Sequence, residues 1–375
     1  MQAKKKLLYL HMEIGNISPG VAKKVQDQIH GLKNRYSCEY IKVEKKSVFA
    51  LILIVYKKVL GSNCAVLYIR NKLFFNLFFL PLLIVKKRRN TVLVLEIPTP
   101  LDTLELEIKQ SAHSFFKRFV SLWMLRVAMP LTLPVFNLVA TVIEERSSYR
   151  KYIRNEIVVG NGIDTGRIVP VSGVQKQDGQ FRLLAIGHIS RWHGYDRLIE
   201  GLKEYIGNGG MDKIPVVLDI VGDGPESESL EKTAEKKGLR DKVHFPGEMR
   251  GNDLIELYMR SDACVGTLGA HRKGLSQTAS LKHREFCAFG LPFITSAEDP
   301  DFPSDDVDFV FYQEPDESPV DVAELVGKLG ALRRNDPNLR ERIRTYAEDR
   351  LDWSVKFKPL LAEIERVARE KENEE

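Results

Sequence analysis

Residues 281–292 read Leu-Lys-His-Arg-Glu-Phe-Cys-Ala-Phe-Gly-Leu-Pro and form the most informative stretch of the chain. They predict an apolar helix over 279–289 that carries Glu285 near its start, closes on Gly290, and leads through Pro292 into a strand over 293–295. The unpaired N–H groups at a helix start favour phosphate. A carboxylate beside them can accept hydrogen bonds from sugar hydroxyls. The stretch therefore suits a ligand that combines a ribose with phosphate.

Three further motifs precede this stretch: Asn161-Gly162-Ile163-Asp164, Gly187-His188-Ile189-Ser190-Arg191-Trp192-His193-Gly194 and Val221-Gly222-Asp223-Gly224-Pro225. Each motif alone is a weak indication. The four together, in this order and at this spacing, resemble the nucleotide-sugar-binding half of family 4 glycosyltransferases, which have the GT-B fold. The resemblance is sharp over roughly residues 157–296 and faint before them.

The resemblance implies a donor site. In the family, the glutamate matched by Glu285 holds the ribose, and cations on the loop matched by residues 187–194 neutralise the diphosphate. The donor-binding residues expected here are Gly187, Arg191, His193, Gly222, Gly224, Arg272, Lys273, Gln277, Thr278, Lys282 and Glu285. Simpler interpretations remain open for each: a helix cap at His193, a plain tight turn at residues 222–225, a solvated loop at residues 271–274, and a surface ion pair between Lys282 and Glu285.

The chain departs from the family pattern at two places. His188 and His193 stand where the family has an arginine and a lysine, so Arg191 or a protonated histidine is expected to supply the cation. Gln277 stands where the family often has a second glutamate that touches the donor sugar. Gln277 can bond a hydroxyl but carries no charge, so the identity of the sugar is left open.

The first half of the chain offers fewer chemical groups. Glu96 is the only carboxylate on the apolar strand expected over 91–97, and we expect it to bind or deprotonate an acceptor hydroxyl, although a structural role is close to equally favoured. Gly15 and Gly20 belong to a loop expected to line the cleft. Two Asp-x-Asp patterns, at 299–301 and 306–308, are interpreted as loop acids, and no metal or other cofactor is expected besides the nucleoside-diphosphate-sugar substrate.

Short strand-type runs alternate with helical stretches along the whole chain. This alternation predicts parallel sheets with right-handed crossovers, that is, an α/β protein of two Rossmann-like domains facing across a cleft. We expect an acceptor-binding domain over 1–165 and a nucleotide-sugar-binding domain over 166–350. The family resemblance implies that the amphipathic helix in residues 351–375 returns to the first domain.

The net charge of +5 hides an asymmetry. Residues 1–170 contain 27 Lys and Arg against 12 Asp and Glu, a balance of +15, and the remainder contains 29 against 39, a balance of −10. The basic half indicates an anionic partner, although a basic surface with no further role is equally compatible. The four cysteines form no Cys-x-x-Cys pair and the N-terminus makes a poor signal peptide, so a cytoplasmic location is expected.

The most apolar window, residues 73–85, is followed by Lys86-Lys87-Arg88-Arg89. Its 13 residues are too few to span a bilayer, which needs about 20. Either it is the buried crossover helix of a βαβ unit, or it leans with its basic end on an anionic membrane face.

The favoured function is a retaining, metal-independent glycosyltransferase that moves a sugar from a nucleoside diphosphate to a saccharide or lipid-linked acceptor in cell-surface polysaccharide assembly. Its partners would be the donor, the acceptor and an anionic membrane surface at the inner face of the membrane, with no nucleic acid. Two alternatives stay open: a GT-B nucleotide-sugar epimerase, and a non-catalytic nucleotide-sugar-binding subunit.

Overall fold

The computed structural model describes residues 4–13, 19–44, 48–70, 75–110, 114–169, 179–208 and 213–373. The chain divides into two compact units, residues 1–162 with 353–375 and residues 163–352, called unit 1 and unit 2 below. Each contains one six-stranded parallel sheet flanked by helices, which confirms the expected α/β fold class.

Unit 1 is built on a sheet whose strands pair in the order β2 (Ser37–Glu44), β1 (Lys6–Glu13), β3 (Val66–Arg70), β4 (Val92–Ile97), β5 (Leu138–Thr141) and β6 (Glu156–Val158). The runs VLYIR of β3 and VLVLEI of β4 are buried throughout, as expected for parallel strands covered on both faces. The described part of the loop after β1 begins at Pro19, so Gly15 lies outside the described residues, while Gly20 is an exposed residue of the first turn of α1 (Pro19–Lys33).

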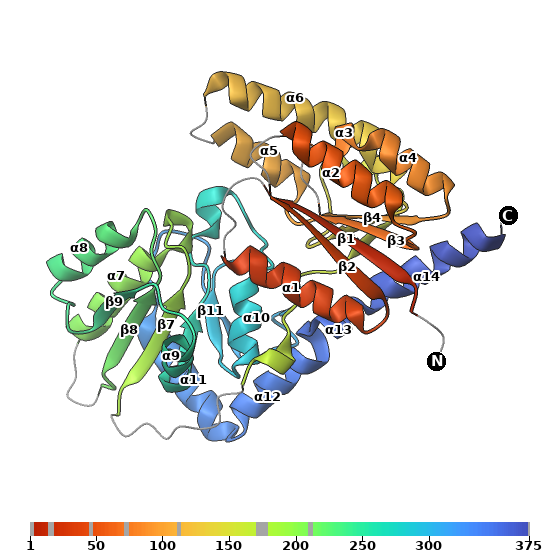
Figure 1. Ribbon diagram of the computed structural model, residues 1–375. Helices are drawn as coiled ribbons and strands as arrows, with labels where there is room; N and C mark the ends of the chain where they lie inside the picture. The colour runs from red at the N-terminus through yellow and green to blue at the C-terminus, as the bar shows by residue number, and fades with distance from the viewer. Residues whose placement is uncertain are drawn as a thin grey trace. The chain divides into compact units, whose positions relative to one another are not determined.

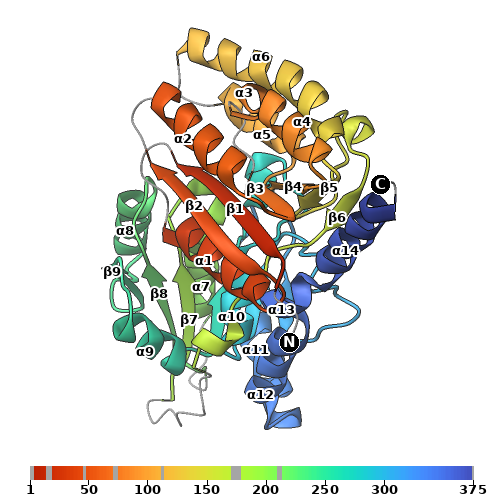
Figure 2. The same cartoon turned by 45° about the vertical axis from the view of Figure 1, so that its right-hand side comes forward.

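Two layers of helices cover this sheet (Figures 1 and 2). One layer consists of α2 (Val48–Gly61), α3 (Phe75–Phe78), α4 (Leu80–Arg88), α5 (Leu101–Gln110) and α6 (Phe115–Thr132). The other consists of α1, α13 (Trp353–Lys356) and α14 (Lys358–Asn373). Trp353 is buried against α1, where a Cβ on Gly31 would lie 2.9 Å from the Trp353 Cβ. The C-terminal helices therefore complete the core of unit 1.

Unit 2 has the strand order β12 (Val310–Tyr312), β11 (Phe293–Thr295), β10 (Ala263–Val265), β7 (Phe181–Ile186), β8 (Val216–Val221) and β9 (Val243–Gly247). Its helices are α7 (Tyr195–Gly207), α8 (Ser227–Lys236), α9 (Asn252–Arg260), α10 (Leu281–Ala288), α11 (Val322–Asn335) and α12 (Leu339–Tyr346). The chain runs from β7 outward through β8 to β9, and then returns to the other side of β7 with β10. The strand order thus reverses between β7 and β10.

Candidate functional site

The loops that follow β7 and β10 meet at the reversal point of the unit 2 sheet. The Leu268 N–H donates to the carbonyl oxygen of His193 at 2.9 Å, and one Arg272 guanidinium nitrogen donates to the carbonyl oxygen of Arg191 at 2.8 Å. Open parallel sheets bind ligands in the crevice outside the carboxyl ends of the strands at such a point. The structure therefore brings the predicted loop 187–194 together with the predicted cations at 272 and 273.

Two glycines let the loop after β8 approach the loop after β7. A Cβ on Gly222, where φ is +123°, would lie 2.0 Å from the carbonyl oxygen of Gly187, and a Cβ on Gly224 would lie 2.2 Å from that of Ile189. A side chain at either position would separate the loops. The turn 222–225 consequently has a structural role, and it brings the ends of β7 and β8 side by side.

Lys282 reaches this crevice from the first turn of α10. Its ammonium donates to the carbonyl oxygen of Gly266 at 3.1 Å and lies 3.3 Å from the Tyr195 hydroxyl. Burial lowers the pKa of Lys282 to about 7. The partners of this ammonium are neutral oxygens, so an anion bound beside it would stabilise its charged form. A nearby negative charge offsets the cost of burying the ammonium.

The loop cations differ in what they contact. Arg272 is almost fully buried, and its guanidinium bonds the carboxylates of Asp196 at 2.7 Å and Glu317 at 2.5 Å. Lys273 lies over the Trp192 ring with its ammonium 4.7 Å from the centroid, and Arg191 is exposed. Arg272 therefore ties the loop after β10 to α7 and to the residues before α11. Arg191 and Lys273 line the adjoining hollow together with Ser190, Trp192, Arg272 and Glu317.

His193 is not the cation that its position in the sequence indicated. Its ring is buried, stacks on Tyr195 with centroids 5.3 Å apart, and accepts the Ser190 N–H at Nδ1 over 3.1 Å. Burial first, and then the charge of Lys282, lowers the pKa of His193 to about 2. The imidazole is thus neutral with its proton on Nε2. It can donate one hydrogen bond to an anion, but it cannot neutralise one.

The segment from Gln277 to Glu285 leads into and through the first half of α10. The Gln277 side-chain amide donates to the Glu298 carboxylate at 3.1 Å, and the Thr278 N–H donates to the Glu298 carbonyl at 2.8 Å. Among the described residues, the buried Thr278 hydroxyl has no hydrogen-bond partner. Glu285 follows Lys282 by three positions and is half-buried beside Tyr258, whose pKa is raised by burial and by the Glu285 charge. Lys282 and Glu285 lie about one turn apart on the same helix, as predicted.

A buried ion cluster behind α10 was missed by sequence reasoning. The Arg284 guanidinium is fully buried and bonds the Asp299 and Asp301 carboxylates, and His283 Nδ1 lies 2.9 Å from Asp299. After the opposing effect of burial, Arg284 holds the pKa of Asp299 far below its usual range. The cluster anchors the helix that carries Lys282 and Glu285. The only signal in the sequence was the pair His283-Arg284, which directly precedes Glu285 and the apolar end of the helix.

Glu96, the predicted acceptor-side residue, is a buried structural carboxylate of unit 1. It is 3% exposed, and its oxygens lie 2.5 Å from Arg70, 3.2 Å from Lys24, and 3.1 and 3.3 Å from the hydroxyls of Tyr9 and Tyr68. Burial would raise its pKa, but Arg70 and Lys24 lower it to about 2. A carboxylate held this firmly is a poor proton acceptor, so the structure disfavours the predicted role as a base.

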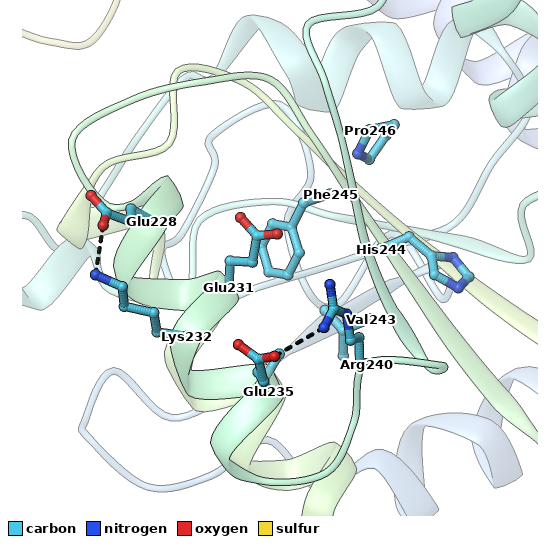
Figure 3. A pocket seen from close by; sticks show the side chains of 10 residues that line it. Glu228, Glu231, Lys232, Glu235, Arg240, Val243, His244, Phe245 and Pro246 are labelled. Carbon is cyan, nitrogen blue, oxygen red and sulfur yellow. Dashed lines mark hydrogen bonds and ion pairs between the residues drawn. The ribbon is translucent and has the colours of Figure 1, made fainter.

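A separate hollow lies at the β9 edge of the unit 2 sheet, between α8 and β9 (Figure 3). Two of the three glutamates that line it are already paired within the fold. Glu228 lies 2.5 Å from Lys232, and Glu235 lies 3.0 Å from Arg240. The hollow is formed by a helix and the side of a strand rather than by loops at the strand ends, so it is not part of the candidate site.

Solved structures identify the architecture. The chain has a GT-B fold, with two Rossmann-like domains. It is similar over 96% of its length to the whole of Anabaena HepE in complex with UDP, with a TM-score of 0.67 and 15% identity. It is similar over 96% of its length to 99% of the apo form of the lipopolysaccharide outer core galactosyltransferase WaaB, with a TM-score of 0.58 and 15% identity. At these identities the likeness concerns the fold alone.

Sequence comparison is more specific for unit 2. Residues 172–350 match the family model described as "Glycosyl transferases group 1". The lipopolysaccharide core biosynthesis glycosyltransferase LpsD of Rhizobium meliloti (strain 1021) is 31% identical over 166 residues, which are 44% of this chain and 42% of LpsD. The chain covers less than half the length of the curated relatives that it matches.

Proposed function

We propose that this protein is a glycosyltransferase of the family 4 type, which transfers a sugar from a nucleoside diphosphate to a saccharide or lipid-linked acceptor with retention of the anomeric configuration and without a metal. The observation that carries the proposal is the convergence at the β7–β10 reversal point. Lys282, the loop 187–194 and the N-terminal half of α10 meet there, an arrangement that supports a phosphate site within one helical turn of the Glu285 carboxylate.

The chain's own groups can be assigned to parts of the donor. Lys282, with Arg191 and Lys273, would bind the two phosphates, and the neutral His193 would add one N–H donor. Glu285 would accept hydrogen bonds from the ribose hydroxyls. The Thr278 hydroxyl and the Gln277 amide would face the sugar. Because the leaving diphosphate gains charge as the glycosidic bond breaks, cations that are already in place stabilise that charge most.

The acceptor half of the proposal rests on other observations. LpsD is a glycosyltransferase of lipopolysaccharide core biosynthesis, and HepE was solved with UDP. The two similar proteins favour a uridine nucleotide as donor and a cell-surface glycan as acceptor. The excess of 15 positive charges in residues 1–170 suits an anionic acceptor.

Donor hydrolysis in the absence of acceptor tests the proposal. A thermal-shift screen against UDP-, GDP- and ADP-sugars would first choose the donor, and release of the nucleoside diphosphate to water would then be followed. We expect slow release that falls at least tenfold in Lys282→Met, while Lys203→Met, an exposed lysine on α7, behaves as wild type. Tight binding without release would instead indicate the non-catalytic subunit. Appearance of an epimeric nucleotide sugar would indicate the epimerase.

A further inference from the structure

The two helix layers of unit 1 present opposite kinds of surface. The outer side of α14 is charged, with Arg366 pairing to Glu363 and Glu370. Helices α2 and α6 lie on the other face of the sheet (Figures 1 and 2). They expose large apolar side chains instead. A layer that exposes aromatic rings to water has a cost that a binding partner would remove.

Helix α6 is two-sided. Phe115, Phe116, Phe119 and Trp123 are 78%, 73%, 58% and 50% exposed, and their spacing places them on one side of the helix. The side chains on the opposite side belong to the core of unit 1, namely Met124, Leu125, Ala128 and Met129. Exposed aromatic side chains therefore occupy one side of this helix, and these four buried aliphatic ones the other.

Helix α2 belongs to the same layer and also exposes apolar side chains. Phe49 and Leu53 are 80% and 71% exposed, and Lys57 follows at the same spacing of four. The Tyr56 hydroxyl donates to the carbonyl oxygen of Phe78 in α3 at 2.9 Å, and α3 packs against α6. We call the exposed side chains of Phe49, Leu53, Phe115, Phe116, Phe119 and Trp123 the aromatic face.

The three helices that carry or adjoin the aromatic face are basic, and the acids of the layer lie on α5, where Glu105 pairs with Arg126 at 2.7 Å. Helices α2, α4 and α6 contain two, three and three Lys or Arg, eight in all, and no Asp or Glu. The expected cluster at 86–89 is only partly available, because Lys86 is buried and donates to the Ser62 carbonyl, and Lys87 donates to the Val135 carbonyl at 2.8 Å. The exposed cations of these three helices are Lys57, Lys58, Arg88, Lys117 and Arg126.

We propose that the aromatic face docks unit 1 on the surface of an anionic lipid bilayer, with the rings of α6 and α2 at headgroup depth and the surrounding lysines against the lipid phosphates. Phenylalanine and tryptophan rings favour that depth, and each nearby cation adds to the attraction of an anionic membrane. This inference goes beyond the glycosyl-transfer proposal and does not depend on it.

Docking, rather than spanning, follows from the inner side of α6. Among the described residues, one helical stretch, Phe115–Val135, is long and apolar enough to cross a membrane by length and composition, and 33% of it is buried. Leu125 and Met129 are fully buried in the core of unit 1. Removing the helix to span a bilayer would open that core, whereas surface docking leaves it in place.

The test is flotation of the full chain with vesicles of phosphatidylcholine alone or with 30% phosphatidylglycerol. We expect binding to the anionic vesicles that weakens as salt rises, and little binding to the neutral ones. The variant Phe116→Ser/Phe119→Ser/Trp123→Ser should bind at least tenfold more weakly. The matched control Val169→Ser/Ile206→Ser/Ile214→Ser, which also removes three exposed apolar side chains but in unit 2, should bind as wild type.

The contribution of the lysines and the depth of the rings in the bilayer are tested in separate experiments. Lys57→Glu/Lys117→Glu should weaken binding to anionic vesicles at least tenfold, and the control Lys203→Glu/Lys236→Glu should not. Fluorescence of Trp123 should be quenched by brominated lipid, and this quenching should disappear in Trp123→Tyr.

Three results would overturn the proposal: no binding to either vesicle, equal binding by the aromatic-face variant, or light scattering that shows a dimer dispersed by that variant, which would mean that a second copy of the chain covers the face. Donor hydrolysis is measured on the same samples. It reports on the donor site in unit 2, so a loss of membrane binding and a loss of donor binding can be told apart.

Discussion

The ammonium group of Lys282 lies 3.1 Å from the carbonyl oxygen of Gly266, the residue that follows strand β10. This contact joins the start of α10 to the reversal point of the sheet, and it places a lysine where the loops after β7 and β10 meet. Because its partners are neutral oxygens and burial lowers its pKa to about 7, Lys282 is partly deprotonated near neutral pH. Its charge state should therefore depend on whether an anion is bound.

Binding of a nucleotide sugar should be accompanied by proton uptake at Lys282. A bound diphosphate favours the charged ammonium and raises its pKa, so at pH 8 a lysine that is mostly neutral when free takes up close to one proton. Both phosphates of a nucleotide sugar are diesters, so the proton belongs to the protein. Calorimetry in two buffers of different ionisation enthalpy measures the uptake.

The sign of the pH dependence follows from the same pKa. Affinity should fall as pH rises above 7, by about tenfold per pH unit while free Lys282 is neutral. In Lys282→Met both the buffer dependence and this slope should disappear. A wild type whose binding enthalpy is the same in both buffers would contradict the assignment. His193 cannot substitute, because its pKa of about 2 keeps it neutral throughout this range.

Gly222→Ala should destabilise unit 2 by more than the strain of placing an alanine at a positive φ. The new Cβ would lie 2.0 Å from the Gly187 carbonyl oxygen, so the loops must separate, at a cost of roughly 2–4 kcal/mol. Gly238→Ala is the matched control: φ there is +72° and a Cβ would meet no atom within 4 Å, so only the cost of the angle, about 1 kcal/mol, remains. Urea unfolding of the two variants should separate them. Equal losses would show that the close approach at Gly222 is unimportant.

Turnover should survive removal of divalent metals. The Asp-x-Asp pair at 299–301 is bonded by Arg284, and in the second pair Asp306 bonds Arg350 and Asp308 bonds Arg342. These acids are used to join parts of unit 2. Nucleoside diphosphate release in EDTA should equal that in buffer. A loss that Mg²⁺ or Mn²⁺ restores would count against metal independence.

The sequence predicts those helices and strands whose pattern of apolar and polar residues is visible within a few consecutive positions. The apolar runs of β3, β4, β7 and β8 read as buried strands, and glycines directly after β7 and β8 mark the ends of those two strands. Strand β2, SCEYIKVE, and helix α12, LRERIRTY, were missed because most of their side chains are polar. For α12 only three of eight side chains are buried, and one of them is Arg344.

The sequence predicted which residues of unit 2 the structure brings together, but not what each of them contacts. Motif order placed Lys282 and Glu285 correctly on one helix, because their spacing is local. The roles of Arg272, Arg284 and Glu96 depend on partners far away in the chain, at distances in sequence that no local pattern encodes. A charged residue in a sequence reads as solvated or catalytic, whereas burial and pairing are known only once the elements are packed.

Glu96→Gln should lower the free energy of unfolding and leave the rate of sugar transfer by the folded protein unchanged. Removing the charge leaves Arg70 and Lys24 buried without their common carboxylate, a loss of about 3–5 kcal/mol at pH 7. Glu96 has a folded pKa of about 2, below its usual 4.5, so its contribution is full above pH 4.5 and is lost as pH falls toward 2. The stability gap between wild type and variant, measured by urea unfolding, should therefore narrow over that range. A variant with wild-type stability but depressed turnover would restore Glu96 as a catalytic base.

Glu285→Ala should weaken nucleotide-sugar binding by roughly 1.5–3 kcal/mol, as expected for loss of a charge-assisted hydrogen bond to the ribose. The side chain is half-buried on α10, so its removal should leave the fold intact, and Lys282 should keep its contact with Gly266. Glu285→Gln, which retains an acceptor oxygen without the charge, should lose less. Glu256→Ala, an exposed carboxylate on α9, is the matched control and should bind normally. Calorimetry with the 2′-deoxy nucleotide separates this role from a general electrostatic one: if Glu285 bonds that hydroxyl, wild type and Glu285→Ala should bind the deoxy ligand with similar affinity. An equal penalty for both ligands would show that Glu285 acts elsewhere on the donor.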